Sequence, residues 1–127
     1  MDRNLELLER LWPSDGRLAL SAEAEHDLRS EDFVLELPQS GERIVGRDTM
    51  RAMQQEYPAP PSIQVIRISG AGDHFVVLLR SDYGGDIYYV ANVVEFHDGR
   101  IARETRIYGA PFEPPEWRAK YGTPPPR

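Results

Sequence analysis

The chain has 127 residues, no cysteine, a formal charge of -6 at pH 7 and a sequence pI of about 5.0. This length fits one domain, and the lack of cysteine excludes disulfides, a thiol nucleophile and a thiolate metal site. The acidic balance argues against a nucleic-acid surface, which needs clustered Lys and Arg, and no apolar run approaches the roughly twenty residues of a membrane span.

Helices are predicted to come first along the chain, ahead of the long strands. Asp2–Trp12 places Leu5, Leu8, Leu11 and Trp12 at helical spacing, and Pro13 follows as a stop signal. Because this start is charged and does not resemble a signal peptide, we expect a soluble protein of the reducing cytoplasm. Two more helices are expected, at Arg17–Leu28 and Arg47–Tyr57.

Strands are predicted to dominate the rest of the chain. The first four are expected at Phe33–Leu37, Glu42–Val45, Ile63–Ser69 and Phe75–Ser81. Gln39-Ser40-Gly41 is predicted as a turn, and a short helix anchored by Trp117 and Tyr121 is expected at Glu116–Tyr121. Helices followed by long antiparallel strands are typical of an α+β domain with helices on one face of a curved sheet. We expect one domain over residues 1–121 and a flexible tail over residues 122–127.

The stretch Asp86–Phe96 and the stretch Arg100–Tyr108 predict a β-hairpin. Tyr, Ile and Val dominate the first, and apolar residues alternate with charged ones in the second. Asp98-Gly99 between them supplies the positive φ angles of a tight turn. The strand period of two gives each strand one shared face, formed by Tyr88, Val90, Asn92, Val94 and Phe96 on the first and by Ala102, Glu104, Arg106 and Tyr108 on the second. If both faces line one concavity, a polar cluster lies inside an apolar cup.

Two runs carry a resemblance to a known family: FVLELPQSGERIVGRDTMRAM and DYGGDIYYVANVVEFHDGRIARETRIYGAPFEPPEW. Together they resemble the SnoaL-like branch of the nuclear-transport-factor-two-like superfamily, over most of the chain from Asp32 to Trp117. The resemblance implies a cone-shaped α+β fold, in which a curved, mixed but mostly antiparallel sheet wraps around N-terminal helices and leaves a pocket. Members include polyketide cyclases, ketosteroid isomerases and epoxide hydrolases, usually dimeric, and others only bind or scaffold.

The sequence also differs from the ketosteroid isomerases at positions that carry their chemistry. Leu37, before Pro38, stands where those enzymes have the Asp that shuttles the proton, and leucine cannot move a proton. Asn92 matches their acidic hydrogen-bond donor in the oxyanion hole, and an amide can still donate to a carbonyl oxygen. Their tyrosine on the first helix has no clear counterpart, although Trp12 lies near that position.

Four side chains of the predicted cup are candidates for chemistry. Glu104 is the candidate proton shuttle, because burial would raise its pKa toward the range of a general base, but Arg106 on the same face could simply pair with it. Asn92 would either donate to an oxyanion or satisfy a buried backbone group. Tyr88 and Tyr108 would either donate to a substrate oxygen or belong to the core with one polar end.

The histidines and Trp117 are weaker candidates. His26, near a helix end, could act as a base if it turned inward, or could be a surface or capping residue. His74 and His97 fall in turns and are interpreted as solvated, and no spacing of His and carboxylates predicts a metal site. Trp117 is expected to close the mouth of the cone by packing, or to form a lid over the pocket.

We therefore predict an isomerase or cyclase that acts without a cofactor on a small, largely apolar carbonyl compound. Glu104 would move the proton, and Asn92 with a tyrosine would hold the oxyanion, while Arg106, Trp12, His26 and Leu37 complete the substrate-binding set. The alternative is a domain that binds a small ligand or another subunit, which the missing Asp before Pro38 supports. A homodimer is expected through the apolar outer face of the hairpin, formed by Ile87, Tyr89, Ala91 and Val93.

Overall fold

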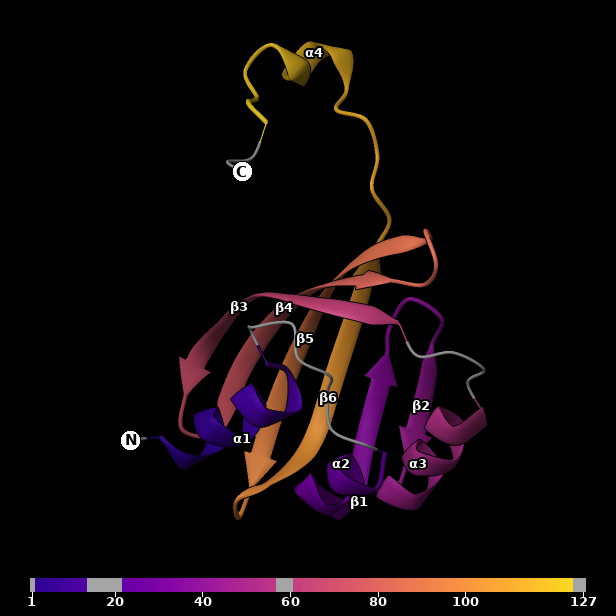
Figure 1. Cartoon of the computed structure of the whole chain (residues 1–127), viewed down its shortest axis with the longest axis vertical. Helices are drawn as coiled ribbons and strands as arrows, with labels where there is room; N and C mark the ends of the chain where they lie inside the picture. The colour runs from indigo at the N-terminus through magenta and orange to yellow at the C-terminus, as the bar shows by residue number, and fades with distance from the viewer. Residues whose placement is uncertain (1, 14–21, 57–60, 125–127) are drawn as a thin grey trace.

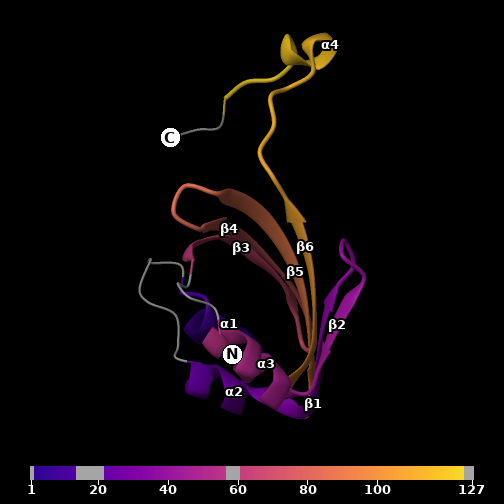
Figure 2. The same cartoon turned by 90° about the vertical axis from the view of Figure 1, so that its right-hand side faces the viewer.

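The computed structural model describes residues 2–13, 22–56 and 61–124. One six-stranded sheet forms the body, with strand order β2-β1-β6-β5-β4-β3. Three helices near the N-terminus lie on the concave side of this curved sheet (Figure 1, Figure 2). The predicted α+β class and the mixed, mostly antiparallel sheet are confirmed. None of the helices within the described ranges is long and apolar enough to cross a membrane.

The helices follow the expected order. They are α1 (Arg3–Leu11), α2 (Ala22–Leu28), α3 (Arg47–Glu56) and the short α4 (Glu116–Ala119). Asp2 caps α1 by accepting from the backbone of Asn4 and Leu5, and it also accepts from the backbone N–H of Gly72 at 2.9 Å. The cap therefore fixes the start of α1 to the turn between two strands. The expected extensions of α2 to Arg17 and of α3 to Tyr57 lie outside the described residues.

Most of the strands extend beyond the runs that predicted them, whereas Glu42–Val45 has the expected bounds. The strands are β1 (Arg29–Leu37), β2 (Glu42–Val45), β3 (Ser62–Ala71), β4 (His74–Asp82), β5 (Ile87–His97) and β6 (Arg100–Gly109). All neighbouring strands are antiparallel except β1 and β6, which are parallel. Because parallel strands end at the same edge, the C-terminal ends of β1 and β6 lie side by side. This pair positions the pocket described below.

The β5–β6 hairpin forms as predicted, with one irregularity. Asp98 and Gly99 have φ angles of 51° and 78°, which the tight turn requires. The register moves from Phe96 opposite Ile101 to Glu95 opposite Arg103, so Ala102 is an extra residue in β6. This bulge places Ile101, and not the predicted Ala102, in the core. Glu104, Arg106 and Tyr108 keep their shared face beyond the bulge.

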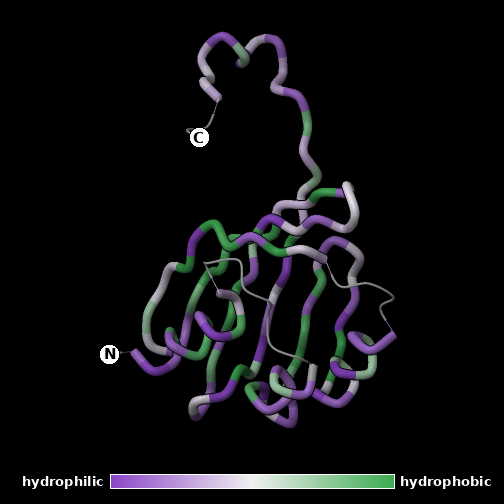
Figure 3. The backbone as a smooth tube through the Cα atoms, viewed as in Figure 1, coloured by the Kyte–Doolittle hydropathy of each residue, from purple (hydrophilic) through white to green (hydrophobic). Residues whose placement is uncertain are grey.

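The core lies between the concave face of the sheet and the helices. Most of the hydrophobic residues lie along the strands (Figure 3). The buried side chains come from α1 and its C-terminal cap, from α3 and from alternate positions of β1, β4, β5 and β6: Leu8, Leu11, Trp12, Phe33, Leu35, Met50, Phe75, Val77, Leu79, Val90, Val94, Phe96 and Ile101. Burial of these side chains is the main source of stability of the fold. The apolar wall predicted for the cup is thus formed by β4 and β5 on one side and by α1 and β1 on the other.

The C-terminal segment contradicts the expected closure by Trp117. After β6 the chain continues away from the body, and α4 stands apart from the sheet in both views (Figure 1, Figure 2). Trp117 is 71% exposed, and Phe112 and Tyr121 are exposed to 78% and 77%. Pro111, Pro114 and Pro115 favour an extended backbone, which carries this segment outward in line with β6. Trp117 therefore neither fills the mouth of the cone nor covers the pocket at the ends of β1 and β6.

Candidate functional site

The two residues expected to carry catalysis do converge inside the cup. Asn92 of β5 lies opposite Arg106 of β6, and Glu104 lies opposite Val94. The amide Nδ2 of Asn92 donates to Oε1 of Glu104 at 2.9 Å, and both side chains are fully buried. The predicted polar cluster inside an apolar cup is therefore present.

Glu104 is held by donors on both carboxylate oxygens. Oε1 accepts from Asn92 and from Nε and Nη2 of Arg106, at 3.2 and 2.6 Å for the two arginine nitrogens. Oε2 accepts from Nε of Arg29 at 3.1 Å, and Nη2 of the same arginine lies 3.0 Å from it in the ion pair. Four hydrogen bonds and two arginine ion pairs therefore stabilise the charged form of the carboxylate.

The pKa of Glu104 moves opposite to the expected direction. Burial by itself favours the neutral acid, but the guanidinium groups of Arg106 and Arg29, with the hydrogen bonds from Arg106 and Asn92, lower the pKa to about 2. For Arg106, burial opposes the charge, but the Glu104 carboxylate raises its pKa above the ordinary arginine range. Glu104 is therefore an ion-paired anion. The alternative considered for it, pairing with Arg106, is the one that the structure contains.

Arg29 brings the start of β1 into this network. It is 1% exposed, it pairs with Glu104, and its Nη1 lies 3.4 Å from Oε2 of Glu25 on α2. Gln54 on α3 also donates to that oxygen of Glu25, at 2.6 Å. The chain of contacts runs from α3 through α2 and β1 to β6. Buried charges of this kind are tolerated because each one is paired and hydrogen-bonded.

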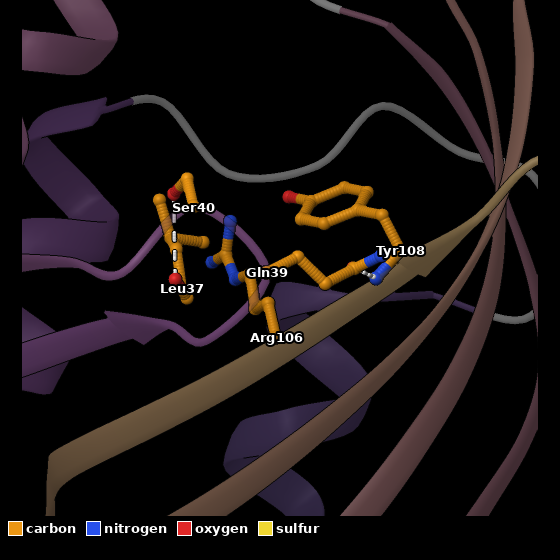
Figure 4. A pocket seen from close by; sticks show the side chains of 5 residues that line it. All are labelled: Leu37, Gln39, Ser40, Arg106 and Tyr108. Carbon is orange, nitrogen blue, oxygen red and sulfur yellow. Dashed lines mark hydrogen bonds between the residues drawn. The ribbon is translucent and has the colours of Figure 1, made fainter.

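A pocket of about 280 Å³ opens where β1 and β6 end (Figure 4). It is lined by Leu37, Gln39, Ser40, Arg106 and Tyr108. The guanidinium of Arg106 is directed toward the space between Ser40 and the ring of Tyr108 (Figure 4). Its side chain is 19% exposed, whereas that of Glu104 behind it is fully covered. Arg106 is thus the charged group of the network that reaches the pocket.

The turn after β1 is fixed against the end of β6. Leu37 ends β1, and Ser40 Oγ donates to its carbonyl oxygen at 3.3 Å. The side-chain oxygen of Gln39 accepts a short hydrogen bond from the backbone N–H of Tyr108. The turn therefore forms one wall of the pocket, and β6 forms the facing wall.

Several solved structures are similar to this chain. One is an NTF2-like protein of unknown function from Burkholderia xenovorans, with 31% identity over 98% of this chain and 96% of that chain and a TM-score of 0.85. This chain belongs to the NTF2-like family. It is also similar to a protein from Kribbella flavida that is provisionally named a ketosteroid isomerase, with 26% identity, coverage of 98% and 91%, and a TM-score of 0.80.

A more distant NTF2-like neighbour shows the fold alone. It is a protein from Jannaschia that is provisionally named a SnoaL-like polyketide cyclase. It shares 15% identity over 84% of this chain and 85% of that chain, with a TM-score of 0.65. No family model and no curated protein sequence matches the chain. The predicted superfamily is confirmed.

In this NTF2-like chain, the predicted site residues separate into four groups. Leu37, Arg106 and Tyr108 line the pocket, and Asn92 and Glu104 lie beneath it. The Nδ2 of Asn92 donates to Glu104 and not toward a ligand, while its Oδ1 has no hydrogen-bond partner among the described residues. Trp12 is 5% exposed and belongs to the core.

Tyr88 and His26, the fourth group, do not line the pocket of the NTF2-like fold. The Tyr88 ring packs edge-on against Tyr108 and Tyr83, with centroid distances of 6.3 and 6.0 Å, and its hydroxyl donates to Asp86 at 3.2 Å. His26 on α2 has its Nε2 2.6 Å from Oδ1 of Asp48 on α3, and this hydrogen bond lowers the pKa of the Asp48 carboxyl. His26 therefore joins two helices and does not line the pocket.

The sequence did not indicate Arg29, Gln39 or Ser40 as site residues. Gln39 and Ser40 were predicted only as parts of a turn, because no local pattern indicates which strand end that turn will meet. Arg29 carried one usable signal, its spacing of four residues from Glu25, which is typical of an ion pair on a helix. Within the described ranges, no three His, Cys, Asp or Glu side chains are grouped to hold a metal ion.

Proposed function

We propose that this NTF2-like protein binds a small organic molecule in the pocket between the β1–β2 turn and the end of β6. The single observation that supports this proposal is the partly exposed guanidinium of Arg106, held from behind by the buried Glu104 carboxylate. An arginine fixed in this way keeps its orientation without a ligand, so little side-chain entropy is lost on binding. Leu37 and the ring of Tyr108 supply apolar contact.

The proposal assigns Glu104 to positioning Arg106 and not to proton transfer. Its pKa of about 2 makes it a weak base at neutral pH, and its oxygens already accept the hydrogen bonds described above. Leu37, at the place where the resembling isomerases have their proton-shuttling Asp, supports the same assignment. The binding alternative from the sequence is therefore favoured over the isomerase or cyclase.

Filling the pocket tests the binding proposal. Ser40 lies in an exposed turn, so Ser40→Trp is expected to occupy the pocket without disturbing the core. Native mass spectrometry of the purified protein, and ligand-observed NMR with a library of small organic compounds, are expected to detect ligands for the wild type and to lose them in Ser40→Trp. The matched control is Ser69→Trp, at an exposed position of β3. Equal binding by wild type and Ser40→Trp would contradict the proposed location.

A second candidate is acid–base isomerisation of a small apolar carbonyl compound without a cofactor. The observation that favours it is the similarity to the Kribbella flavida protein, over nearly the whole of both chains. Its signature would be deuterium uptake from D₂O at the carbon beside a ketone, measured by NMR and lost in Glu104→Gln. Our binding proposal expects no such enzyme-dependent uptake.

We also propose that the protein is a homodimer that associates through the outer face of the sheet. Val76 lies opposite Val93, and Ala91 lies opposite both Leu78 and Ile107, so these side chains form one continuous surface. With Tyr89 they make the outer apolar patch, in which Val76, Tyr89 and Ile107 are 37%, 48% and 49% exposed. A contiguous apolar surface of this kind favours association over exposure to water. The cytoplasmic location stays a prediction.

A further inference from the structure

The donors around the pocket suggest which class of ligand it takes. Glu104 accepts two of the five N–H bonds of the Arg106 guanidinium, and both bonds come from the edge formed by Nε and Nη2. The outer end, where Nη1 and Nη2 carry the remaining N–H bonds, meets no carboxylate of the described residues. An outward-facing guanidinium end is the arrangement that binds a carboxylate with charge-assisted hydrogen bonds.

Tyr108 extends this group of donors. Its ring and hydroxyl lie on the wall of the pocket beside the Arg106 guanidinium (Figure 4). A tyrosine hydroxyl carries one O–H donor, which can serve an acceptor on a ligand. Arg106 and Tyr108 therefore present N–H and O–H donors side by side to a ligand in the pocket (Figure 4).

The other lining residues add a donor and an apolar wall but no negative charge. Gln39 uses its amide oxygen on the backbone of Tyr108, which leaves its amide N–H₂ as a donor, and Leu37 is apolar. Of the described residues that line the pocket, none is acidic. A group that only accepts hydrogen bonds and carries negative charge complements this surface.

We propose that the natural ligand is a small monocarboxylate with a compact apolar body. Its oxygens accept from the outer end of Arg106 and from the Tyr108 hydroxyl, and its body lies against Leu37 and the ring of Tyr108. This inference rests on the proposed binding function and goes beyond it by specifying an ionised acid where the sequence predicted a neutral carbonyl compound. Charge-assisted hydrogen bonds are about twice as strong as neutral ones, so the carboxylate is expected to be preferred over a neutral ligand of the same shape.

The buried network gives a physical reason for this preference. Arg106 is neutralised by Glu104, but Glu104 is shared with a second cation, Arg29. Glu25 balances Arg29 from the far side, at the longer distance of 3.4 Å. An anion at the outer end of Arg106 would complete an alternating row of charges from Glu25 through Arg29, Glu104 and Arg106. Alternation places each charge beside opposite ones, which is the favourable arrangement where solvent screening is weak.

Benzoate and benzamide distinguish the two ligand classes, since they share one shape and differ in charge. By isothermal titration calorimetry at pH 7, we expect benzoate to bind roughly tenfold or more tightly than benzamide, a difference that corresponds to about 1.4 kcal/mol. Gln39→Glu, in the exposed turn, places a negative charge at the pocket and should weaken benzoate about tenfold while changing benzamide by less than about twofold. Gln64→Glu is the matched control, because it makes the same change on β3 and should alter neither affinity.

Several results would overturn the carboxylate assignment. Equal affinity for benzoate and benzamide would show that Arg106 does not select an anion. The same conclusion would follow if Gln64→Glu weakened the binding of benzoate as much as Gln39→Glu does. Binding of benzamide alone, abolished by Ser40→Trp, would overturn the ligand class and leave the pocket function standing. Retention of all binding in Ser40→Trp would overturn both. Arg106→Lys, which keeps the charge but removes the planar set of donors, should also weaken benzoate by roughly tenfold.

Discussion

Glu104 shows how the surroundings of one side chain decide its chemistry. The alternation of side chains along β6 directs Glu104 inward as expected. Burial without partners would have raised its pKa. Two arginines and one amide reverse that effect, because each stabilises the charged form of the acid. The residue expected to act as a general base is therefore an ion-paired carboxylate, and Arg106 is the charged side chain of this network that reaches the pocket.

Replacing Glu104 is expected to affect stability in a pH-dependent way. Glu104→Gln leaves Arg29 and Arg106 without their shared anion, and breaking a buried ion pair from one side costs about 3–5 kcal/mol of unfolding free energy. The folded pKa of about 2 lies below the ordinary value of 4.5, so the stabilisation is complete above pH 4.5 and is lost as the pH falls toward 2. Urea unfolding should therefore show a large gap between variant and wild type at pH 7 and a smaller one near pH 3.

Glu9→Gln is the control for this measurement, because Glu9 is exposed on α1. It should change the unfolding free energy by less than about 0.5 kcal/mol at either pH. A gap between Glu104→Gln and wild type that stays constant from pH 7 to pH 3 would contradict the ion-pair account of Glu104.

At the scale of elements, the parallel pairing of β1 with β6 creates the pocket. It brings the turn after Leu37 beside Tyr108, although the two segments lie far apart in the sequence. The antiparallel strands on the other side form the apolar wall, and the turn between β3 and β4 receives the N-terminus of α1 through Asp2. The geometry of that turn therefore supports both the sheet and the first helix.

Gly70 and Gly72 give a test of this turn. At Gly70, with φ of 128°, an added Cβ would lie 2.3 Å from the backbone oxygen of His74, whereas at Gly72, with φ of 66°, it would meet nothing within 4 Å. Gly72→Ala should cost only the left-handed backbone strain, about 1–2 kcal/mol. Gly70→Ala should cost clearly more, because the strand pair must open to relieve the clash. Thermal unfolding measures both, and equal losses would contradict the observed close approach of β3 and β4.

At the scale of the whole molecule, the two faces of the sheet have different roles. The concave face is covered by helices and holds the charged network, while the convex face carries the outer apolar patch. The C-terminal segment extends beyond both with Phe112, Trp117 and Tyr121 exposed.

The dimer proposal predicts the effect of one charge on the outer apolar patch. Ile107→Glu would place a carboxylate in the middle of the interface, where it would be desolvated without a partner. Light scattering at micromolar concentration should then report a monomer, with the wild type a dimer. Val45→Glu is the matched control, since Val45 is 56% exposed on β2, separated from the patch by β1. A monomeric wild type would contradict the proposal.

The sequence by itself determined the features that depend on neighbouring residues. The apolar spacing of α1, the Asp98-Gly99 turn and the alternation along β5 and β6 all arise within a few residues, so local patterns predict them. The family resemblance also predicted the curved sheet and the cone-shaped fold. The same patterns correctly placed Asn92 and Glu104 together.

Only the tertiary structure decided what those residues do. Arg29 lies 75 residues from Glu104 in the sequence, and Gln39 lies 69 residues from Tyr108, so no local spacing could indicate either contact. The pKa of Glu104 depends on the sum of burial and of charges that arrive from β1 and β6, and these act in opposite directions. The sign of that sum, and with it the choice between a proton shuttle and a counter-ion, follows from distances that exist only once the strands are paired.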